Sequence, residues 1–428
     1  MMRSKRTVLF MYALGYLGIA ILTQTTVKWY QYFYAPPEVN EHGLQVLVPI
    51  AFIGIAMVIA RIVDGIADPV VAYFSDKSKH HLGRRIPYIL YGAVPLVVTF
   101  ILLWFPPLPY ESFVNLIYLA IMLALFFIFF TVVVTPYLAL IGELTETKQE
   151  RVTLTTMQGI TQVIGVIIAE AGSGLIISTY GFKVMGITLG IVSLLTILLT
   201  PYFVYEKNKE LDHSFSIFAS LKLTLKNKNF LIYLFFYITI WFGINSLTIA
   251  MPYITEILLQ KSAETSGLMI GSAFIFALIF SPFIPRITNM FTKKAIMLLT
   301  AGLFSLLLFL TGWFGTFISY PFAFVVVLLT GIPLAVIFII PNAMVADIAQ
   351  QDGIDHGERR EGMFFGAQGL IIKIVIGLSS FVTPFIFHTF GYSQTKYLGL
   401  QLIGPISSVV IVIGIILLSR YDLPDEIK

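Results

Sequence analysis

The stretch Leu44–Phe74 reads LQVLVPIAFIGIAMVIARIVDGIADPVVAYF, an apolar run of membrane-spanning length that carries one arginine and two aspartates. A charged side chain near the centre of a bilayer costs about 2.5–3.5 kcal/mol, so three charges in one span need a compensating reason. Residues three, four and seven positions apart share one face of a helix, so Arg61, Asp64 and Asp68 project together. This face is predicted to look into the protein or into a water-filled cavity, away from lipid.

The composition of the whole chain supports a membrane protein. Of its 428 residues, 57% are hydrophobic and 12% are charged, and the mean hydropathy is +0.89. These values lie far outside the range of soluble domains and predict an all-α polytopic fold of about twelve transmembrane helices. The predicted spans are residues 8–34, 44–74, 88–106, 113–142, 152–179, 184–205, 230–258, 265–285, 296–316, 320–348, 362–386 and 397–418.

The positive charges predict how the chain is oriented. Most of the 27 Lys and Arg residues fall on the side of the membrane that holds the N-terminus. The positive-inside rule therefore predicts that both termini are cytoplasmic, in a multi-pass protein of the cell membrane or inner membrane. The first span lacks a convincing cleavage site and is expected to be retained. The chain has no Cys, which excludes thiol chemistry, and its net charge of +4 indicates no nucleic-acid partner.

The longest polar connection divides the spans into two groups of six. The predicted domains are a bundle over residues 1–205, a cytoplasmic linker over 206–229 and a second bundle over 230–428. Within the linker, apolar residues at helical spacing predict an interfacial helix. They are Phe215, Phe218, Leu221 and Leu225.

The two halves also resemble each other. Pro136 precedes Gln158-Gly159 in the first half, as Pro341 precedes Gln368-Gly369 in the second. Two six-helix halves in parallel repeat are typical of alternating-access transporters of the major facilitator type. We therefore expect two related bundles, and a monomer in the lipid bilayer.

The paired acids of the second span admit two interpretations. Carboxylates one turn apart repel each other, so one holds a proton or the pair binds a cation. The alternative is a static network of ion pairs with Arg61 and Lys373. A coupling-ion site is favoured, because acids inside a membrane usually mark ion or proton pathways.

Several motifs resemble the glycoside-pentoside-hexuronide cation symporters, the family of the melibiose permease. They are Asp64-x-x-x-Asp68-Pro69, Asp76, Gly83-Arg84-Arg85-x-Pro87-Tyr88, Thr135-Pro136-Tyr137, Glu150-Arg151 and Glu358–Gly366 with Gln368 and Lys373. They span both halves of the chain. The resemblance implies a major facilitator fold and coupling to Na⁺, Li⁺ or H⁺, with no other cofactor.

The resemblance also implies where the cation binds. In that family the cation lies between the two acids and a threonine of the fourth helix, near a lysine of the eleventh. Asp64, Asp68, Thr131 and Lys373 match these positions. The melibiose permease has an asparagine just before the second acid, where this chain has Ala67. Losing that amide weakens the case for Na⁺ and leaves H⁺ open.

The sugar site departs further from the family pattern. The positions that match the permease's two sugar-binding aspartates and its arginine hold Ala20, Val134 and Gly159. Each sugar hydroxyl loses water on entry and needs a polar partner, so recognition like that of the permease is not expected.

Other polar residues inside the spans are candidates for the substrate cavity. They are Gln24, Lys28, Gln31, Gln158, Gln162, Glu170, Trp241 and Asn245. Lys28 either meets an anionic or hydroxylated substrate or extends its ammonium to the lipid headgroups. Glu170 binds substrate, carries a proton or pairs with a neighbouring helix, and the sequence does not choose among these roles.

Charges in the cytoplasmic loops predict a gate. Major facilitator proteins resemble one another in using such charges to latch helix ends. The predicted gate residues are Asp76, Arg84, Arg85, Arg359, Arg360 and Glu361. For the arginines, ordinary positive-inside charge is an equal explanation.

These features together predict a cation-coupled symporter for a small organic solute, with a sugar or sugar derivative favoured. The main alternative is a sodium-dependent transporter of lysolipids or other amphiphiles with the same fold. An integral membrane enzyme is disfavoured because the six His are scattered in or beside loops and no nucleotide-binding motif occurs. A channel is disfavoured by the two-half repeat.

Overall fold

The computed structural model describes residues 5–78, 80–145, 147–206, 224–356 and 361–422. The regular elements in these ranges are helices, which confirms the predicted fold class. Ten of the described helices are long and apolar enough to cross a membrane, and α3 (Ile86–Leu102) is a shorter apolar helix. One candidate span, Gln149–Phe203, holds two predicted spans, because Gly181 breaks it with a φ of +80°. This break accounts for the twelfth predicted span.

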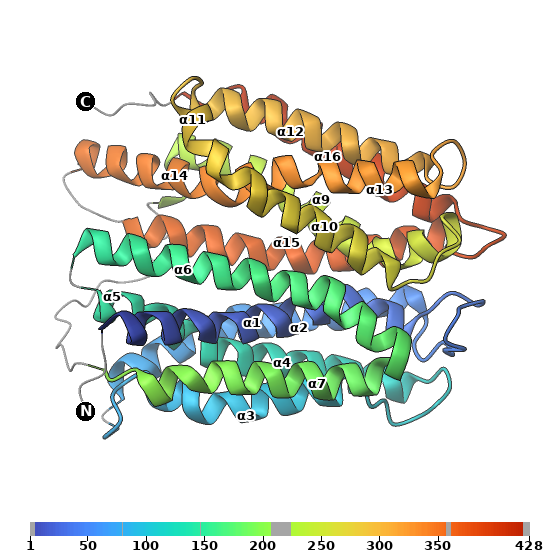
Figure 1. The fold of residues 1–428 in the computed structure, drawn as a ribbon, viewed down its shortest axis with the longest axis horizontal. Helices are drawn as coiled ribbons and strands as arrows, with labels where there is room; N and C mark the ends of the chain where they lie inside the picture. The colour runs from blue at the N-terminus through green and yellow to red at the C-terminus, as the bar shows by residue number, and fades with distance from the viewer. Residues whose placement is uncertain (1–4, 79, 146, 207–223, 357–360, 423–428) are drawn as a thin grey trace. The chain divides into compact units, whose positions relative to one another are not determined.

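The described helices form two compact units. The first contains the described residues up to 206 together with Ser262–Gly271. Its helices are α1 (Lys5–Tyr34), α2 (Ile50–Lys77), α3, α4 (Phe113–Ala139), α5 (Ile141–Leu144), α6 (Lys148–Ile167), the π-helix η1 (Ile168–Gly172) and α7 (Ser173–Phe203). Within this unit α2 lies along α4, while α1 lies along α6 and α7, and α3 contacts α4 and α7 (Figure 1).

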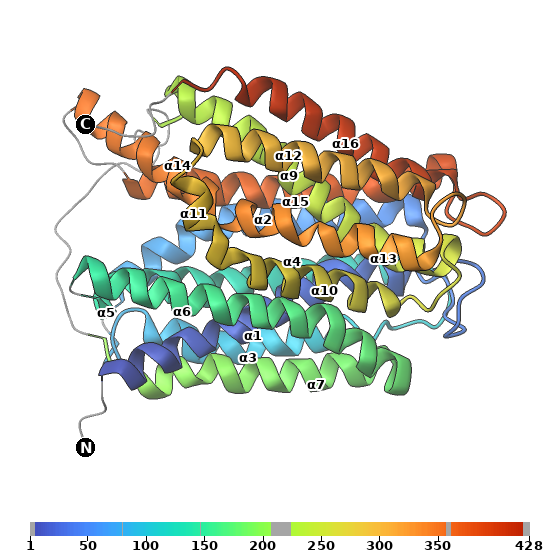
Figure 2. The same ribbon diagram turned by 45° about the horizontal axis from the view of Figure 1, so that its top comes forward.

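The second unit contains residues 224–261 and the described residues from Ser272 onward. Its helices are α9 (Lys228–Tyr253), η2 (Ile254–Leu258), the later part of α10 (Thr265–Phe280), η3 (Ser281–Phe283), α11 (Ile284–Thr288), α12 (Lys293–Leu310), η4 (Thr311–Trp313), α13 (Tyr320–Leu329), α14 (Gly331–His356), α15 (Glu361–Phe390) and α16 (Leu398–Leu418). Here α9 lies along α15 and α16, and α12 contacts α14 and α16 (Figure 2).

The same packing pattern occurs in both units. The first helix of each unit packs on its last two long helices, α6 and α7 in one and α15 and α16 in the other. The third span packs on the fourth and the last, as α3 does on α4 and α7, and α12 on α14 and α16. The domain boundaries at 205 and 230 stay a prediction, and the interfacial helix predicted around Phe215 lies outside the described residues.

Polar side chains mark where several helices begin. Ser112, Thr147, Asn227 and Thr292 precede α4, α6, α9 and α12, and each side-chain oxygen accepts a backbone N–H of the first turn. Such N-caps satisfy donors that a helix start leaves without an intrahelical partner. The starts of these four helices are therefore specified by the residue that directly precedes each helix.

Two predicted boundaries are wrong. The tenth span was predicted to end at residue 348, but α14 continues to His356. The second span was predicted to begin at residue 44, but α2 begins at Ile50, directly after Pro49. The N–H groups of Leu47 and Val48 instead donate to the Tyr34 carbonyl oxygen at the end of α1. Residues 44–49 are largely apolar but form a connection that packs on its neighbours. Hydropathy alone does not distinguish such a connection from a membrane span.

Candidate functional site

The charged face of α2 packs on α4, and the two helices run in the same direction. Residue numbers rise together along their contacts, from Arg61 with Phe127 to Asp64 with Thr131 and Asp68 with Thr135. Parallel helices bring side chains one turn apart on one helix beside side chains one turn apart on the other. The three charges of the second span therefore meet three successive turns of α4.

The central contact joins Asp64 and Thr131. The Thr131 hydroxyl donates to Asp64 Oδ1 at 2.5 Å, and both residues are buried, with exposed fractions of 0% and 1%. Arg61 Nη1 lies 3.3 Å from the other carboxylate oxygen, Oδ2. Asp64 thus has a hydroxyl on one oxygen and a guanidinium on the other, as a buried carboxylate requires.

Asp68 lies one turn further along α2 and is half-buried. Its Oδ1 lies 3.3 Å from the Thr131 hydroxyl oxygen, whose proton goes to Asp64, and it accepts the Thr135 hydroxyl at 3.4 Å, which is long for this type of bond. Thr135 is a member of the site that the sequence reasoning missed. The signal was present, because Thr135 follows Thr131 by one turn, as Asp68 follows Asp64.

Arg61, Asp64 and Asp68 of α2, with Thr131 and Thr135 of α4, form a row along the contact between the two helices. Arg61 lies at one end of this row. Its guanidinium carbon lies 3.8 Å from the ring centre of Phe127, one turn before Thr131. A desolvated guanidinium over an aromatic face is stabilised electrostatically, so Phe127 helps to hold Arg61 beside Asp64. The structure therefore brings together Arg61, Asp64, Asp68 and Thr131, and their part in binding a cation stays a prediction.

Proline follows the site on both helices. Pro69 comes directly after Asp68, and Pro136 directly after Thr135. Proline has no N–H, so the carbonyl oxygens of Gly65 and Val132 receive no helical hydrogen bond from them. Both oxygens belong to the turns that carry the acids and the threonines.

The row holds two carboxyl groups, those of Asp64 and Asp68, and one guanidinium, which lies beside Asp64. Lys373, the predicted fourth member, lies on α15 in the second unit, and its approach to the acids stays a prediction.

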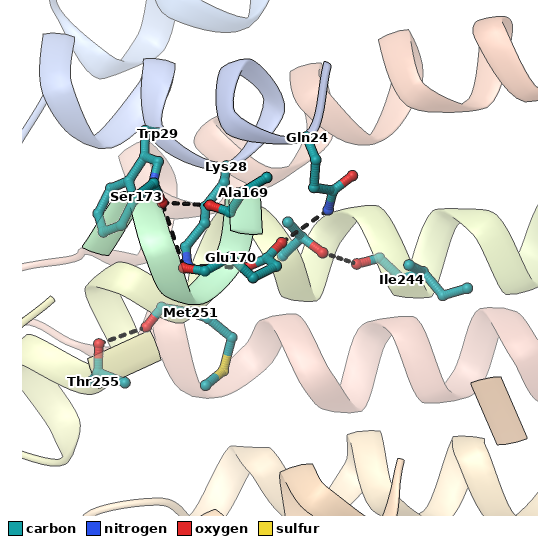
Figure 3. Close-up of polar contacts among 10 residues, drawn as sticks. Gln24, Lys28, Trp29, Ala169, Glu170, Ser173, Ile244, Met251 and Thr255 are labelled. Atoms are coloured by element: carbon teal, nitrogen blue, oxygen red, sulfur yellow. Dashed lines mark hydrogen bonds and ion pairs between the residues drawn. The ribbon is translucent and has the colours of Figure 1, made fainter. Parts of the chain in front are cut away.

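A second polar cluster lies between α1 and the π-helix η1 (Figure 3). Lys28 Nζ lies 2.8 Å from Glu170 Oε2 and donates to the Glu170 carbonyl oxygen at 3.0 Å. Gln24, one turn before Lys28, donates from Nε2 to Glu170 Oε1 at 2.9 Å. Lys28 and Glu170 are both fully buried. The structure therefore excludes the reading in which Lys28 extends to lipid headgroups.

Neighbouring contacts hold this cluster rigidly. Trp29 Nε1 donates to Ser173 Oγ at 2.7 Å, and Ser173 Oγ donates in turn to the Ala169 carbonyl oxygen. The Lys28 ammonium lies 4.8 Å from the Trp29 ring centre. One-turn π-helices often occur at functional sites, and this one carries Glu170 toward α1.

The remaining cavity candidates are spread over both units. Gln31 is buried on α1 and donates to the Tyr30 hydroxyl at 2.6 Å. On α6, Gln158 is buried and Gln162 is half-buried. On α9, Asn245 donates to Ser379 Oγ of α15 at 2.5 Å, while Trp241 packs on Phe338.

The predicted gate arginines have carboxylate partners that the sequence reasoning missed. Arg84 and Arg85 both pair with Glu143, at 2.9 and 3.2 Å, and the Arg85 backbone N–H donates to Glu206 at 2.8 Å. Glu143 lies in α5, and Glu206 lies just after α7. Arg359 and Arg360 lie outside the described residues, and so do the side chains of Asp76 and Glu361. Their part in a gate stays a prediction.

Comparisons with known proteins agree with this architecture. The model of the family described as MFS/sugar transport protein matches residues 11–419. A Bacillus subtilis (strain 168) protein described as an uncharacterized symporter, YnaJ, is 24% identical over 401 residues, covering 89% of this chain and 82% of the relative. The sodium-dependent lysophosphatidylcholine symporter 1 of Xenopus tropicalis is 28% identical over 131 residues, covering 30% of this chain and 25% of the relative.

A solved structure shows the same fold. The crystal structure of the nucleoside transporter NupG superposes with a TM-score of 0.69 at 14% sequence identity, covering 98% of this chain and all of the other. The family match extends over nearly the whole chain and confirms the resemblance to cation symporters that the motifs indicated. The chain therefore belongs to the MFS/sugar transport protein family, and it is a multi-pass membrane transporter.

Proposed function

We propose that this protein is a symporter in which one monovalent cation, Na⁺ or H⁺, binds among Asp64, Asp68, Thr131 and Thr135. The observation that carries the proposal is the row of two carboxylates facing two hydroxyls on parallel helices. Carboxylate, hydroxyl and carbonyl oxygens are the ligands that hard cations prefer. A threonine hydroxyl can donate to a carboxylate and still offer a lone pair to an ion.

We expect one monovalent cation per transport cycle, bound beside Asp68, because Arg61 already pairs with Asp64. A neutral row costs less to carry through a membrane than a charged one. We expect Lys373 to neutralise the acids when the ion is absent, as the family resemblance implies. Ion arrival then releases the lysine.

Cation binding can be tested without knowing the substrate. An ion that binds the folded state raises its stability by RT ln(1 + [L]/Kd). Thermal unfolding of the purified protein is measured in NaCl and in choline chloride at equal ionic strength, and at pH 5.5 and 8. We expect Na⁺ or acid to stabilise the wild type, and Asp68→Asn to lose this response.

Asp347→Asn is the matched control. Asp347 is also an aspartate on a long helix, and it forms an ion pair with Lys293 at 2.5 Å. It should retain the cation response of the wild type. The proposal fails if neither Na⁺ nor acid stabilises the wild type relative to Asp68→Asn.

The solute is proposed to be a sugar or sugar derivative. The family description names sugar transport and covers nearly the whole chain, whereas the lysolipid symporter matches 30% of it. Gln24, Lys28, Gln31, Gln158, Gln162, Glu170, Trp241 and Asn245 remain the candidates for solute contacts. Glu170 and Lys28 already satisfy each other, so solute contact by either requires their pair to open.

A lysolipid or another amphiphile is the second candidate. Ala20 and Val134, which replace sugar-binding acids of the melibiose permease, are buried apolar residues here. Such residues suit an acyl chain better than hydroxyl groups. A thermal-stability screen against sugars, uronides and lysolipids, with and without Na⁺, separates the two classes by which ligand raises the unfolding temperature.

We further propose a cell-membrane location with both termini cytoplasmic, and a monomeric transporter. The charge asymmetry of the loops supports this orientation. Labelling of single cysteines placed near each terminus, in intact cells and in inverted vesicles, tests it directly because the native chain has no cysteine.

A further inference from the structure

A third group of ionisable side chains takes no part in the cation row. His42 lies in the connection between α1 and α2, and Glu264 lies directly before α10. His42 Nε2 is in hydrogen-bond contact with Glu264 Oε1. The His42 side chain is 22% exposed and that of Glu264 is 7% exposed, so water reaches the imidazole but hardly the carboxylate.

Glu264 is held in its ionised form. Burial raises the pKa of its carboxyl group, but hydrogen bonds from His42 and Ser262, together with the charge of His42, outweigh burial and lower the pKa overall. Glu264 is therefore an anion throughout the neutral range. A proton that arrives at this pair goes to the imidazole, because a carboxylate in contact stabilises the imidazolium form.

The charged side chains around His42 favour the binding of one proton. Lys28 interacts electrostatically with both Glu170 and Glu264. These two carboxylates and one ammonium sum to one negative charge while His42 is neutral, and to zero when it is protonated. Glu41 and Lys261 flank the pair in sequence but are exposed, so solvent and salt screen them.

The segment that carries Glu264 packs tightly within the first unit. A Cβ on Gly267 would lie 2.0 Å from the Glu170 carbonyl oxygen, and a Cβ on Gly174 would lie 3.0 Å from that of Glu264. Contacts this close require that Ser262–Gly271 sits directly on η1 and α7. Any change that loosens Glu264 therefore loosens the first turns of α10.

We propose that His42 and Glu264 form a proton-binding site, separate from the Asp64–Asp68 row, in which a proton on His42 fastens Ser262–Gly271 to the rest of the first unit. Imidazole is the side chain whose ordinary titration lies nearest to neutral pH, so the test compares pH 7.5 with pH 5.5. The ligand is the proton itself, and the site needs no transported solute.

Hydrogen exchange of the segment tests the proposal directly. The N–H groups of Thr265, Ser266 and Gly267 donate to the carbonyl oxygens of Ser262, Ala263 and Glu264, which makes them reporters of the first turn of α10. Exchange is measured by mass spectrometry at pH 7.5 and 5.5, corrected for the intrinsic chemical rates. If the closed segment binds the proton about tenfold more tightly than the opened one, protection is about 5-fold greater at pH 5.5 than at pH 7.5.

Variants assign the effect to this pair. His42→Gln keeps a hydrogen-bond donor without the charge and should abolish the pH-dependent gain, and Glu264→Gln should abolish it too. His388→Gln removes an exposed histidine near the end of α15 and should keep the gain. The proposal is overturned if the wild type shows equal protection at both pH values, or if His42→Gln and Glu264→Gln both keep the gain. Because the readout is local exchange, loss of Na⁺ binding at Asp68 leaves this outcome unchanged.

Discussion

Replacing Thr131 by valine tests the centre of the cation row. The substitution keeps the branched shape of the side chain but removes the hydroxyl that lies 2.5 Å from Asp64 Oδ1. Thr131 is only 1% exposed, so water does not readily replace this hydroxyl. A hydrogen bond to a charged group contributes about 1.5–3 kcal/mol. We therefore expect cation affinity to fall about 10- to 100-fold, which corresponds to about 1.4–2.8 kcal/mol.

Affinity is measured from the rise in unfolding temperature as Na⁺ or acid is titrated into the purified protein. Thr131→Ser restores a hydroxyl and should recover most of the affinity. Thr135→Val is the comparison within the same row, because its hydroxyl lies 3.4 Å from a half-buried carboxylate. We expect it to lower the affinity less than Thr131→Val does, since long hydrogen bonds are weak. Equal losses in Thr131→Val and Thr135→Val, or no loss in the first, would refute this reasoning.

Three further predictions concern stability. Lys28→Met leaves Glu170 as an unpaired buried charge and should destabilise the protein by about 3–5 kcal/mol, whereas the double variant with Glu170→Leu should recover much of the loss in thermal unfolding. Gly267→Ala should cost about 1–3 kcal/mol by overpacking, while Gly302→Ala, with open space around its added Cβ, should be neutral or stabilising in the same measurement. The lowered pKa of Glu264 means that its ionised form contributes stability above the ordinary value of 4.5, and this contribution is lost as the pH falls through the folded-state pKa. The stability difference between wild type and Glu264→Gln should therefore shrink below pH 4.5, and a difference that is unchanged there counts against the assignment.

Helical periodicity and hydropathy predicted much of this protein correctly. Arg61, Asp64 and Asp68 fall at three- and four-residue spacing, so any helix through them must project them on one face. The twelve spans follow in the same way, because a run of apolar residues has few alternatives to a membrane helix. Where the prediction failed, as at Pro49, hydropathy did not separate a packed connection from the helix that follows it.

The partners of these side chains were harder to predict. Thr135 was overlooked although it shares the spacing of the acids, and Glu143 and Glu206 were overlooked as partners of Arg84 and Arg85. Each of these contacts joins residues more than fifty positions apart. Sequence spacing carries no information about which helix faces which, unless a relative supplies it, as it did for Thr131.

The sequence by itself determined that this chain crosses the membrane many times and that its second span carries three charged residues on one face. The cost of burying charge in lipid is a local property, and it can be calculated from one helix alone. Only the tertiary structure decided that Lys28 binds Glu170 instead of reaching the headgroups, and that His42 meets Glu264. Those outcomes depend on which side chains from distant parts of the chain arrive within about 3 Å, because only then does pairing offset the cost of burial.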